Sequence, residues 1–230
     1  MNKIKFYCIN LKSRPDRMVE SQNEFSKYNL KINWVEWVLV KKAPHIGAAL
    51  SHAKIIKKNL KNDVNTICIF EDDIKLKKWF LDSFLKAIEH TPPDCHILYL
   101  WGLMLRKSKI NKVNQYIHRV KWITGAYGVV YNKCCYTNIL KTLNEGAKIW
   151  NFEWYKTFDD WLAKTYQHNH PCYITSSLLV WERKSYSNIE KRVKNSSLKY
   201  KFRFLFYKNG VWKILDIVGD IKDLIEWYLK

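Results

Sequence analysis

Residues 66–73 of the chain read Thr-Ile-Cys-Ile-Phe-Glu-Asp-Asp, an apolar run that ends abruptly in three carboxylates. The β-branched and aromatic run 66–70 predicts a buried strand. Ligands of open α/β sheets bind beyond the carboxyl ends of strands, and that is where Glu71, Asp72 and Asp73 fall. Adjacent carboxylates repel one another, so they need solvent, basic partners or a bound cation. An acidic N-cap for a following helix is the alternative to a substrate site.

Strand and helix patterns alternate on both sides of this run. Ser13, with Asp16 three residues later, has the spacing of a capping box and is expected to be the N-cap of the first helix. The order of elements predicts an α/β layered fold with a mostly parallel central sheet. Strands are expected at 4–9, 33–40, 66–70, 96–100, 123–131 and 173–181, and helices at 13–25, 48–62, 80–88, 133–143 and 158–166.

The overall composition fits a globular protein with a basic surface. With 230 residues, 47% of them hydrophobic, the chain can bury a sizeable core, and we expect one catalytic domain over 1–190 with a basic helical appendage over 191–230. The 40 Lys and Arg against 21 Asp and Glu give a net charge of +19, which favours anionic partners. The charge is spread along the chain without a nucleic-acid-binding signature, so it argues only weakly for nucleic acid.

The sequence shows neither a membrane span nor a secretory leader. No apolar run approaches the roughly 20 residues of a span, and the first ten residues are too short and too polar for a signal peptide. These features predict a cytoplasmic protein. Six cysteines without a C-x-x-C pair indicate reduced core thiols rather than a metal site.

The C-terminal stretch combines basic and aromatic side chains. Basic residues crowd 183–203, aromatic residues are interleaved from Tyr200 to Phe206, and 215–229 is predicted to be an amphipathic helix. One interpretation is peripheral contact with the anionic inner face of a membrane. Ordinary packing of a small helical subdomain is the other.

Several short motifs follow one another along the chain. Residues 9–17 (INLKSRPDR), 46–52 (IGAALSH) and 69–73 (IFEDD) are followed by 124–130 (TGAYGVV), 158–162 (FDDWL) and 187–189 (SNI). In this order, over about residues 3–190, they resemble the motifs of glycosyltransferase family 25, the lipopolysaccharide-type and collagen-type galactosyltransferases. Asn188 where Asp is usual, Asp160 where His is frequent and a short middle region are departures that bear on the acceptor.

The resemblance implies a GT-A-like, Rossmann-type domain and an inverting, metal-dependent reaction. A hexose, galactose or glucose, would pass from a UDP-sugar to a hydroxyl of a saccharide, lipid-linked glycan or hydroxylated peptide. The implied metal is Mn²⁺ or Mg²⁺. A metal ion held by Asp73 and Glu71 would neutralise the leaving diphosphate, and Asp72 would hold the ribose or the sugar.

One further carboxylate is needed to deprotonate the acceptor hydroxyl. Asp159 matches the aspartate of the family motif and is the first candidate, with Asp160 the second. The alternative role, for Asp160 above all, is to cap the helix over 158–166.

The remaining motif residues are implied to bind the donor. They are Asn10, Leu11, Arg14, Arg17, Ser51, His52, Gly125 and Ala126. Arg14 and Arg17 lie about one helical turn apart and could face the phosphates, with a solvated first turn as the alternative. A lone His such as His52 is more often structural.

Two other functions are compatible with the sequence. A non-catalytic domain of the same fold would bind nucleotide-sugar or glycan without turnover. A basic nucleic-acid-binding protein would account for the net charge and for the aromatic residues after Tyr200.

Overall fold

The computed structural model describes residues 4–40, 44–149, 157–183, 185–187 and 192–194. A mixed sheet in the order β2-β1-β3-β8-β5-β9-β7-β6 forms its centre. Only β8 and β7 run against the other strands, so the sheet is largely parallel. The strands are β1 (Ile4–Asn10), β2 (Ile32–Glu36), β3 (Thr66–Glu71), β5 (Ile97–Tyr99), β6 (Leu103–Lys112), β7 (Ile117–Thr124), β8 (Gly128–Asn132) and β9 (Cys172–Thr175).

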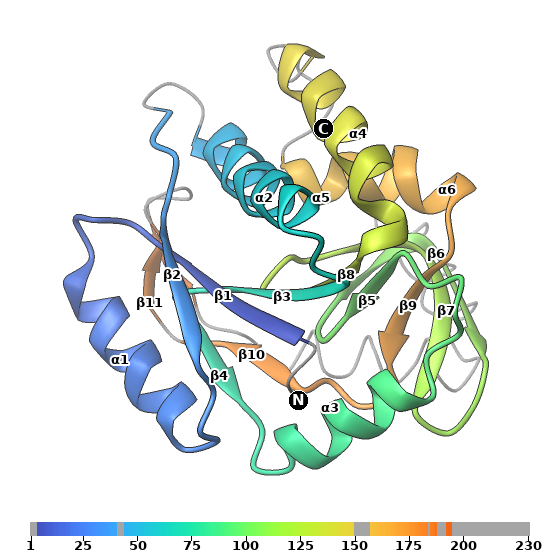
Figure 1. Ribbon diagram of the computed structural model, residues 1–230, viewed down its shortest axis with the longest axis horizontal. Coiled ribbons are helices and arrows are strands. Elements are labelled where there is room, and N and C mark those ends of the chain that lie inside the picture. The colour runs from blue at the N-terminus through green and yellow to red at the C-terminus, as the bar shows by residue number, and fades with distance from the viewer. Residues whose placement is uncertain (1–3, 41–43, 150–156, 184, 188–191, 195–230) are drawn as a thin grey trace, which may run out of the picture.

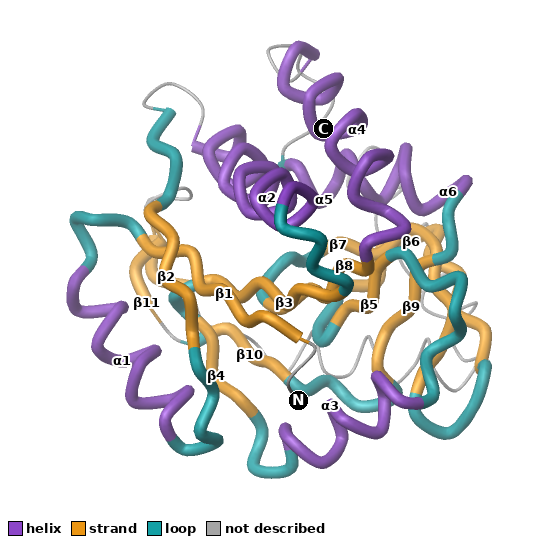
Figure 2. Tube along the Cα trace, viewed as in Figure 1, coloured by secondary structure: helices purple, strands orange, loops and turns teal. Residues whose placement is uncertain are grey.

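Helices cover both faces of the sheet (Figure 1). Four of them, α2, α4, α5 and α6, lie over one face, and α1 and α3 lie over the other, beside the small β4–β10 ladder (Figure 2). The bounds are α1 (Pro15–Ser26), α2 (Pro44–Lys61), α3 (Phe80–Glu89), α4 (Tyr136–Ile149), α5 (Phe158–Trp161), a π-helical segment (Leu162–Tyr166), α6 (Gln167–Asn169), β4 (Ile74–Leu76) and β10 (Val180–Glu182). A short 3-10 turn (Lys133–Cys135) precedes α4, and β11 (Ser185–Ser187) pairs with β12 (Arg192–Lys194).

The core beneath the sheet is aromatic. Phe70 of β3 is fully buried, and its ring centroid lies 5.2 Å from that of Phe25 on α1 and 6.2 Å from that of Phe80 on α3. Burial of such a side chain contributes about 1.5–3 kcal/mol. The packing fixes the end of β3, and hence Glu71, relative to α1.

The start of the first helix differs from the prediction. The helix α1 begins at Pro15 with Arg14 in the N-cap position and no capping side chain, so the prediction of Ser13 as N-cap is wrong. Proline is pre-organised for the first helical position. The Asp16 carboxylate, expected to complete a capping box, is bound instead by the Arg14 guanidinium at 2.8 Å.

Two predicted strands are each divided in the structure. The run 123–131 ends one strand, β7, and begins another, β8, because Gly125 takes a positive φ of 107° between them. The run 173–181 belongs partly to β9 and partly to β10, which lie in different sheets. The Lys-rich strand β6 was not predicted, because its sequence does not alternate cleanly between apolar and polar residues.

Other expectations concern the cysteines, membrane spans and the C-terminus. All six cysteines are free, and five of them are buried, as expected for core thiols, whereas Cys134 is exposed. Among the described residues, no helix is both long enough and apolar enough to span a bilayer. Apart from 192–194, the predicted appendage over 191–230 and its helix over 215–229 lie outside the described residues.

Candidate functional site

The acidic turn, Glu71 to Asp73, connects β3 to β4. Both Asp72 and Asp73 are only 6% exposed. The two carboxylate oxygens of Asp72 accept hydrogen bonds from Asn10 Nδ2 at 2.7 Å and from Arg17 Nη1 at 2.8 Å. Arg17 Nη1 also lies 3.3 Å from Asp73 Oδ2. One buried guanidinium thus links the two aspartates, as buried carboxylates require.

The fold explains why these residues meet. Asn10 ends β1, the neighbour of β3, and the sheet register sets Ile9 opposite Glu71. Arg17 lies in the first turn of α1, which directly follows β1. Since the acidic turn leads into β4 and α3 begins only at Phe80, the turn does not cap a helix.

The backbone of the acidic turn is also held from outside. Ser21 Oγ donates to the Asp72 carbonyl at 2.7 Å, and the Arg183 guanidinium donates to the same oxygen. The Arg183 main-chain N–H donates to the Asp73 carbonyl at 2.6 Å. Both carbonyls are therefore occupied by protein donors.

Asp159 lies at the start of α5 and is tied to the segment between β7 and β8. Its Oδ2 accepts a hydrogen bond from Gly125 N at 2.7 Å. A Cβ at Gly125 would lie 2.2 Å from the Trp101 ring, so only glycine fits there. Thr157 is the N-cap, and its side chain accepts from Asp160 N, so neither aspartate is the capping residue.

Tyr127 links the segment between β7 and β8 to the acidic turn. Glu71 N donates to the Tyr127 carbonyl at 3.3 Å. Burial, followed by the charges of Glu182, Asp73 and Glu71, raises the pKa of the Tyr127 hydroxyl. Residues 125–127 therefore connect Asp159 on one side with the acidic turn on the other.

Glu182 and Arg183 were not identified from the sequence. Glu182 is 6% exposed and pairs with Ile74 of β4, directly after the acidic turn. The signal that could have found these residues is the one that marked the acidic turn, because charged residues follow a buried apolar run in both segments. Their place beside Asp72 and Asp73 depends on a contact between residues more than 100 positions apart.

Ser51 and His52 lie in buried surroundings on α2. Ser51 Oγ donates to the Gly47 carbonyl at 2.7 Å and accepts from Val38 N at 2.8 Å. His52 Nδ1 lies 3.1 Å from the Tyr131 hydroxyl, and burial lowers the pKa of His52 to about 3. These contacts anchor α2, and the expected roles of both residues in donor binding stay predictions.

The other residues predicted to bind the donor lie near the acidic turn or beside Asp159. Arg14 Nη2 donates a hydrogen bond to Asp16 Oδ2 at 2.8 Å, and this bond lowers the pKa of the Asp16 carboxyl to about 2. Leu11 is partly buried after β1, and Ala126 is buried next to Gly125. Arg17 directly contacts both aspartates of the acidic turn.

The chemistry of the donor set bears on the implied metal. Within the described residues, no group of three or more His, Cys, Asp or Glu is arranged to hold a metal ion. The carboxylate oxygens of Asp72 already bind Asn10 and Arg17. A hard cation is commonly held by one or two carboxylates completed by substrate phosphates, so Asp73 and Glu71 as metal ligands stay a prediction.

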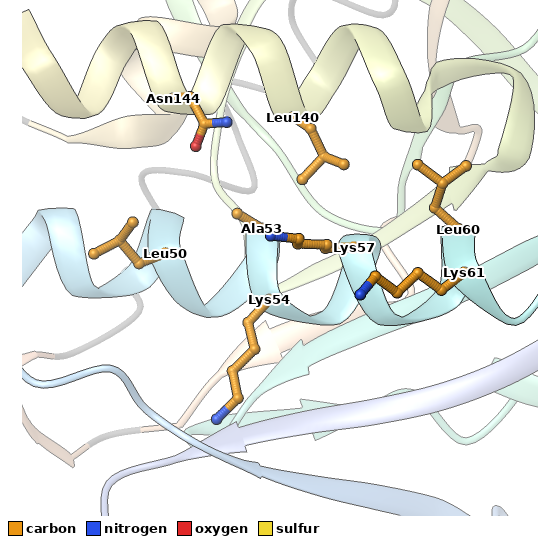
Figure 3. Close-up of a pocket in the computed structure, with 8 residues that line it drawn as sticks. All are labelled: Leu50, Ala53, Lys54, Lys57, Leu60, Lys61, Leu140 and Asn144. Atoms are coloured by element: carbon orange, nitrogen blue, oxygen red, sulfur yellow. The ribbon is translucent and has the colours of Figure 1, made fainter.

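A second surface feature, the basic groove, lies between α2 and α4 and has a volume of about 480 Å³. Leu140 and Asn144 of α4 point toward α2, whereas Lys54 points away from α4 (Figure 3). The 18 residues of α2 include no carboxylate. The lining residues are Leu50, Ala53, Lys54, Lys57, Leu60, Lys61, Leu140 and Asn144.

The model of glycosyltransferase family 25 (LPS biosynthesis protein) matches residues 42–213 of the chain. A solved glycosyltransferase involved in the glycosylation of the major capsid of PBCV-1 is 9% identical, with a TM-score of 0.45, over 66% of this chain and 72% of that one. A197 from STIV is 10% identical, with a TM-score of 0.42, over 85% and 95%. Mannose-1-phosphate geranyltransferase from Thermus thermophilus is 7% identical, with a TM-score of 0.42, over 75% and 73%. No curated protein gives a significant match.

Proposed function

Because the chain belongs to glycosyltransferase family 25, we propose that it is a GT-A-like enzyme that transfers galactose or glucose from a UDP-sugar. The acceptor is a hydroxyl of a saccharide, a lipid-linked glycan or a hydroxylated peptide. One observation carries the proposal. Residues 125–127 bind both Asp159, through Gly125 N at 2.7 Å, and the acidic turn, through the Tyr127 carbonyl at 3.3 Å. A candidate base and a candidate donor site thus share one edge of the sheet.

The acidic turn provides the donor side. Asp73 and Glu71 would hold Mn²⁺ or Mg²⁺ together with the donor phosphates, and the ion supplies positive charge against the departing diphosphate. Asp72 is oriented by Asn10 and Arg17. A carboxylate has about four lone-pair sites, so Asp72 retains capacity to accept a hydroxyl of the ribose or the sugar.

Asp159 provides the acceptor side. The bond from Gly125 N fixes its Oδ2, which orients the rest of the carboxylate. Asp159 removes the proton of the acceptor hydroxyl while that oxygen attacks the anomeric carbon, and the bond from this carbon to the diphosphate breaks. Attack opposite the leaving group inverts the configuration. Asp160, in the same helical turn, is the second candidate for the base.

The experiment is a donor screen that measures UDP release from UDP-galactose, UDP-glucose and related nucleotides, with and without Mn²⁺. Metal-dependent release with an acceptor present is the expected result. Neither release nor metal-dependent donor binding would refute the proposal. Donor binding without turnover across a broad acceptor panel would favour the non-catalytic alternative instead.

A further inference from the structure

Arg183 follows β10 and contacts the acidic turn together with α1. Its Nη2 donates to the Asp72 carbonyl and, at 3.0 Å, to Ser21 Oγ. Its Nη1 lies 2.7 Å from Glu20 Oε2. The Arg183 side chain is 17% exposed, so solvent weakens its bonds to the Asp72 carbonyl and to Ser21 little, whereas its partner Glu20 is 59% exposed.

The contacts of Arg183 with the acidic turn go to main-chain atoms. The guanidinium binds the Asp72 carbonyl, and the main-chain N–H binds the Asp73 carbonyl at 2.6 Å. Arg17, in contrast, binds the carboxylates of both aspartates. One arginine therefore balances the charge of the acidic turn, and the other fixes the path of its backbone.

We propose that Arg183 is a positioning residue, which orients Asp72 and Asp73 toward the donor diphosphate without touching the substrate. This inference rests on the proposed function. The guanidinium joins three segments that are remote in sequence, namely the acidic turn, α1 and the end of β10. Its bond to Asp72 limits rotation of the peptide that precedes Asp73, and the directions of both carboxylates depend on that peptide.

Removal of the guanidinium leaves two other bonds to the main-chain carbonyls of Asp72 and Asp73. Arg183 N still donates to the Asp73 carbonyl, and Ser21 Oγ still donates to the Asp72 carbonyl. The acidic turn should therefore loosen without unfolding. Misplacement of reacting groups by about 1 Å can lower a rate about 100-fold, so a loss of about 10- to 100-fold in kcat/KM is expected.

The test compares Arg183→Gln and Arg183→Lys with Glu20→Gln as the matched control. Glu20→Gln removes the charge of the exposed partner of Nη1 and leaves the bond to the Asp72 carbonyl in place. Amide hydrogen exchange is measured for peptides covering 71–76, and UDP affinity is measured by calorimetry with Mn²⁺. Values of kcat, KM and Tm complete the set.

Arg183→Gln should speed exchange at 71–76 alone and weaken UDP binding about tenfold. The reason is that the hydrogen bond from the charged guanidinium to the Asp72 carbonyl is stronger than one between neutral groups, and it orders the atoms that it joins. Arg183→Lys should partly restore the slow exchange and the UDP affinity, and Glu20→Gln should match the wild type in both measurements. Unchanged exchange and UDP affinity, or faster exchange throughout the sheet in step with a lower Tm, would overturn the inference. If the wild type binds no UDP, the proposed function fails, and exchange at 71–76 still decides whether Arg183 holds the turn.

Discussion

The acidic turn and the basic groove differ in the burial and the pairing of their charged side chains. In the acidic turn, Asp72 and Asp73 are nearly inaccessible and share a fixed guanidinium. In the basic groove, Lys54, Lys57 and Lys61 are exposed, and no described carboxylate lies within ion-pair distance of them. The net charge of +19 therefore arises on exposed surfaces such as the groove. The candidate catalytic chemistry lies instead at the buried carboxylates of the acidic turn.

This contrast has an energetic side. Exposed charges interact through water and contribute about 0–1 kcal/mol per pair. Removal of one partner from a buried pair costs about 3–5 kcal/mol, because a charge is left without compensation. Substitutions in the two regions should consequently differ in size, and four experiments test this.

The largest effect is expected for Arg17→Met. The change leaves Asp72 and Asp73 buried without their shared guanidinium and should lower the free energy of unfolding by about 3–5 kcal/mol. Urea unfolding measures it. Lys86→Met, which removes the cation of an exposed pair with Asp82, is the control and should cost less than about 1 kcal/mol. Equal losses in the two variants would contradict the contrast.

Asp73→Asn should act on turnover more than on stability. It removes a negative charge from the proposed donor site and should lower kcat about 100- to 1,000-fold, the usual loss when one group that stabilises transition-state charge is removed. UDP release measures it, and circular dichroism checks the fold. Asp82→Asn, on the exposed face of α3, should retain wild-type turnover. A fully active Asp73→Asn would remove Asp73 from the donor site.

The inner face of α2 gives an intermediate effect that depends on pH. Burial lowers the pKa of His52 to about 3, so below pH 6.5 the unfolded chain binds a proton that the folded chain does not. Stability should therefore fall as pH decreases through the window from about 6.5 to 3. At pH 5.0 the buried neutral His52 should lower the free energy of unfolding by about 2 kcal/mol relative to neutral pH, since each pH unit below 6.5 costs about 1.4 kcal/mol.

Urea unfolding of the wild type and of His52→Asn at pH 7.5 and 5.0 isolates this contribution. The variant should lose less stability on acidification than the wild type. The same loss in both proteins would show that His52 takes up its proton in the folded state.

The smallest effect is expected in the basic groove. Changing Lys54, Lys57 and Lys61 together to Gln lowers the net charge from +19 to +16 and relieves repulsion between like charges one turn apart. Stability at low salt should rise by about 0.5 kcal/mol, and added salt should abolish the difference. Lys5, Lys12 and Lys31, which are exposed elsewhere, provide the matched triple. A loss above about 1 kcal/mol would show that the groove lysines have partners.

Local patterns were sufficient for the centre of the fold. The apolar run 66–70 predicted β3 because β-branched and aromatic residues fill a strand buried on both faces. The helix over 80–88 was equally clear, since Phe80 and Phe84 recur at helical spacing on its buried face. Where one face or one period dominates, sequence and structure agree.

The errors arose where tertiary contacts decide the structure. Gly125 looked like a residue within a strand, but its contact with Trp101 and its bond to Asp159 turn the chain there. The bond between the Ser21 hydroxyl and the Asp72 carbonyl, like the bond from Arg183, joins segments that no local pattern connects. Sequence motifs could mark Asp72 as important, but they could not reveal which groups hold it.

The short segment 125–127 has a consequence for how such an enzyme could acquire new acceptors. It ties Asp159 and the acidic turn to the same three residues of main chain, so the spacing between them is set by peptide geometry. Side chains on surrounding loops can then be exchanged without altering that spacing. An insertion or deletion within 125–127, in contrast, would uncouple the two halves of the site at once. Sequence changes that alter the choice of acceptor should therefore occur in the surrounding loops and not within 125–127.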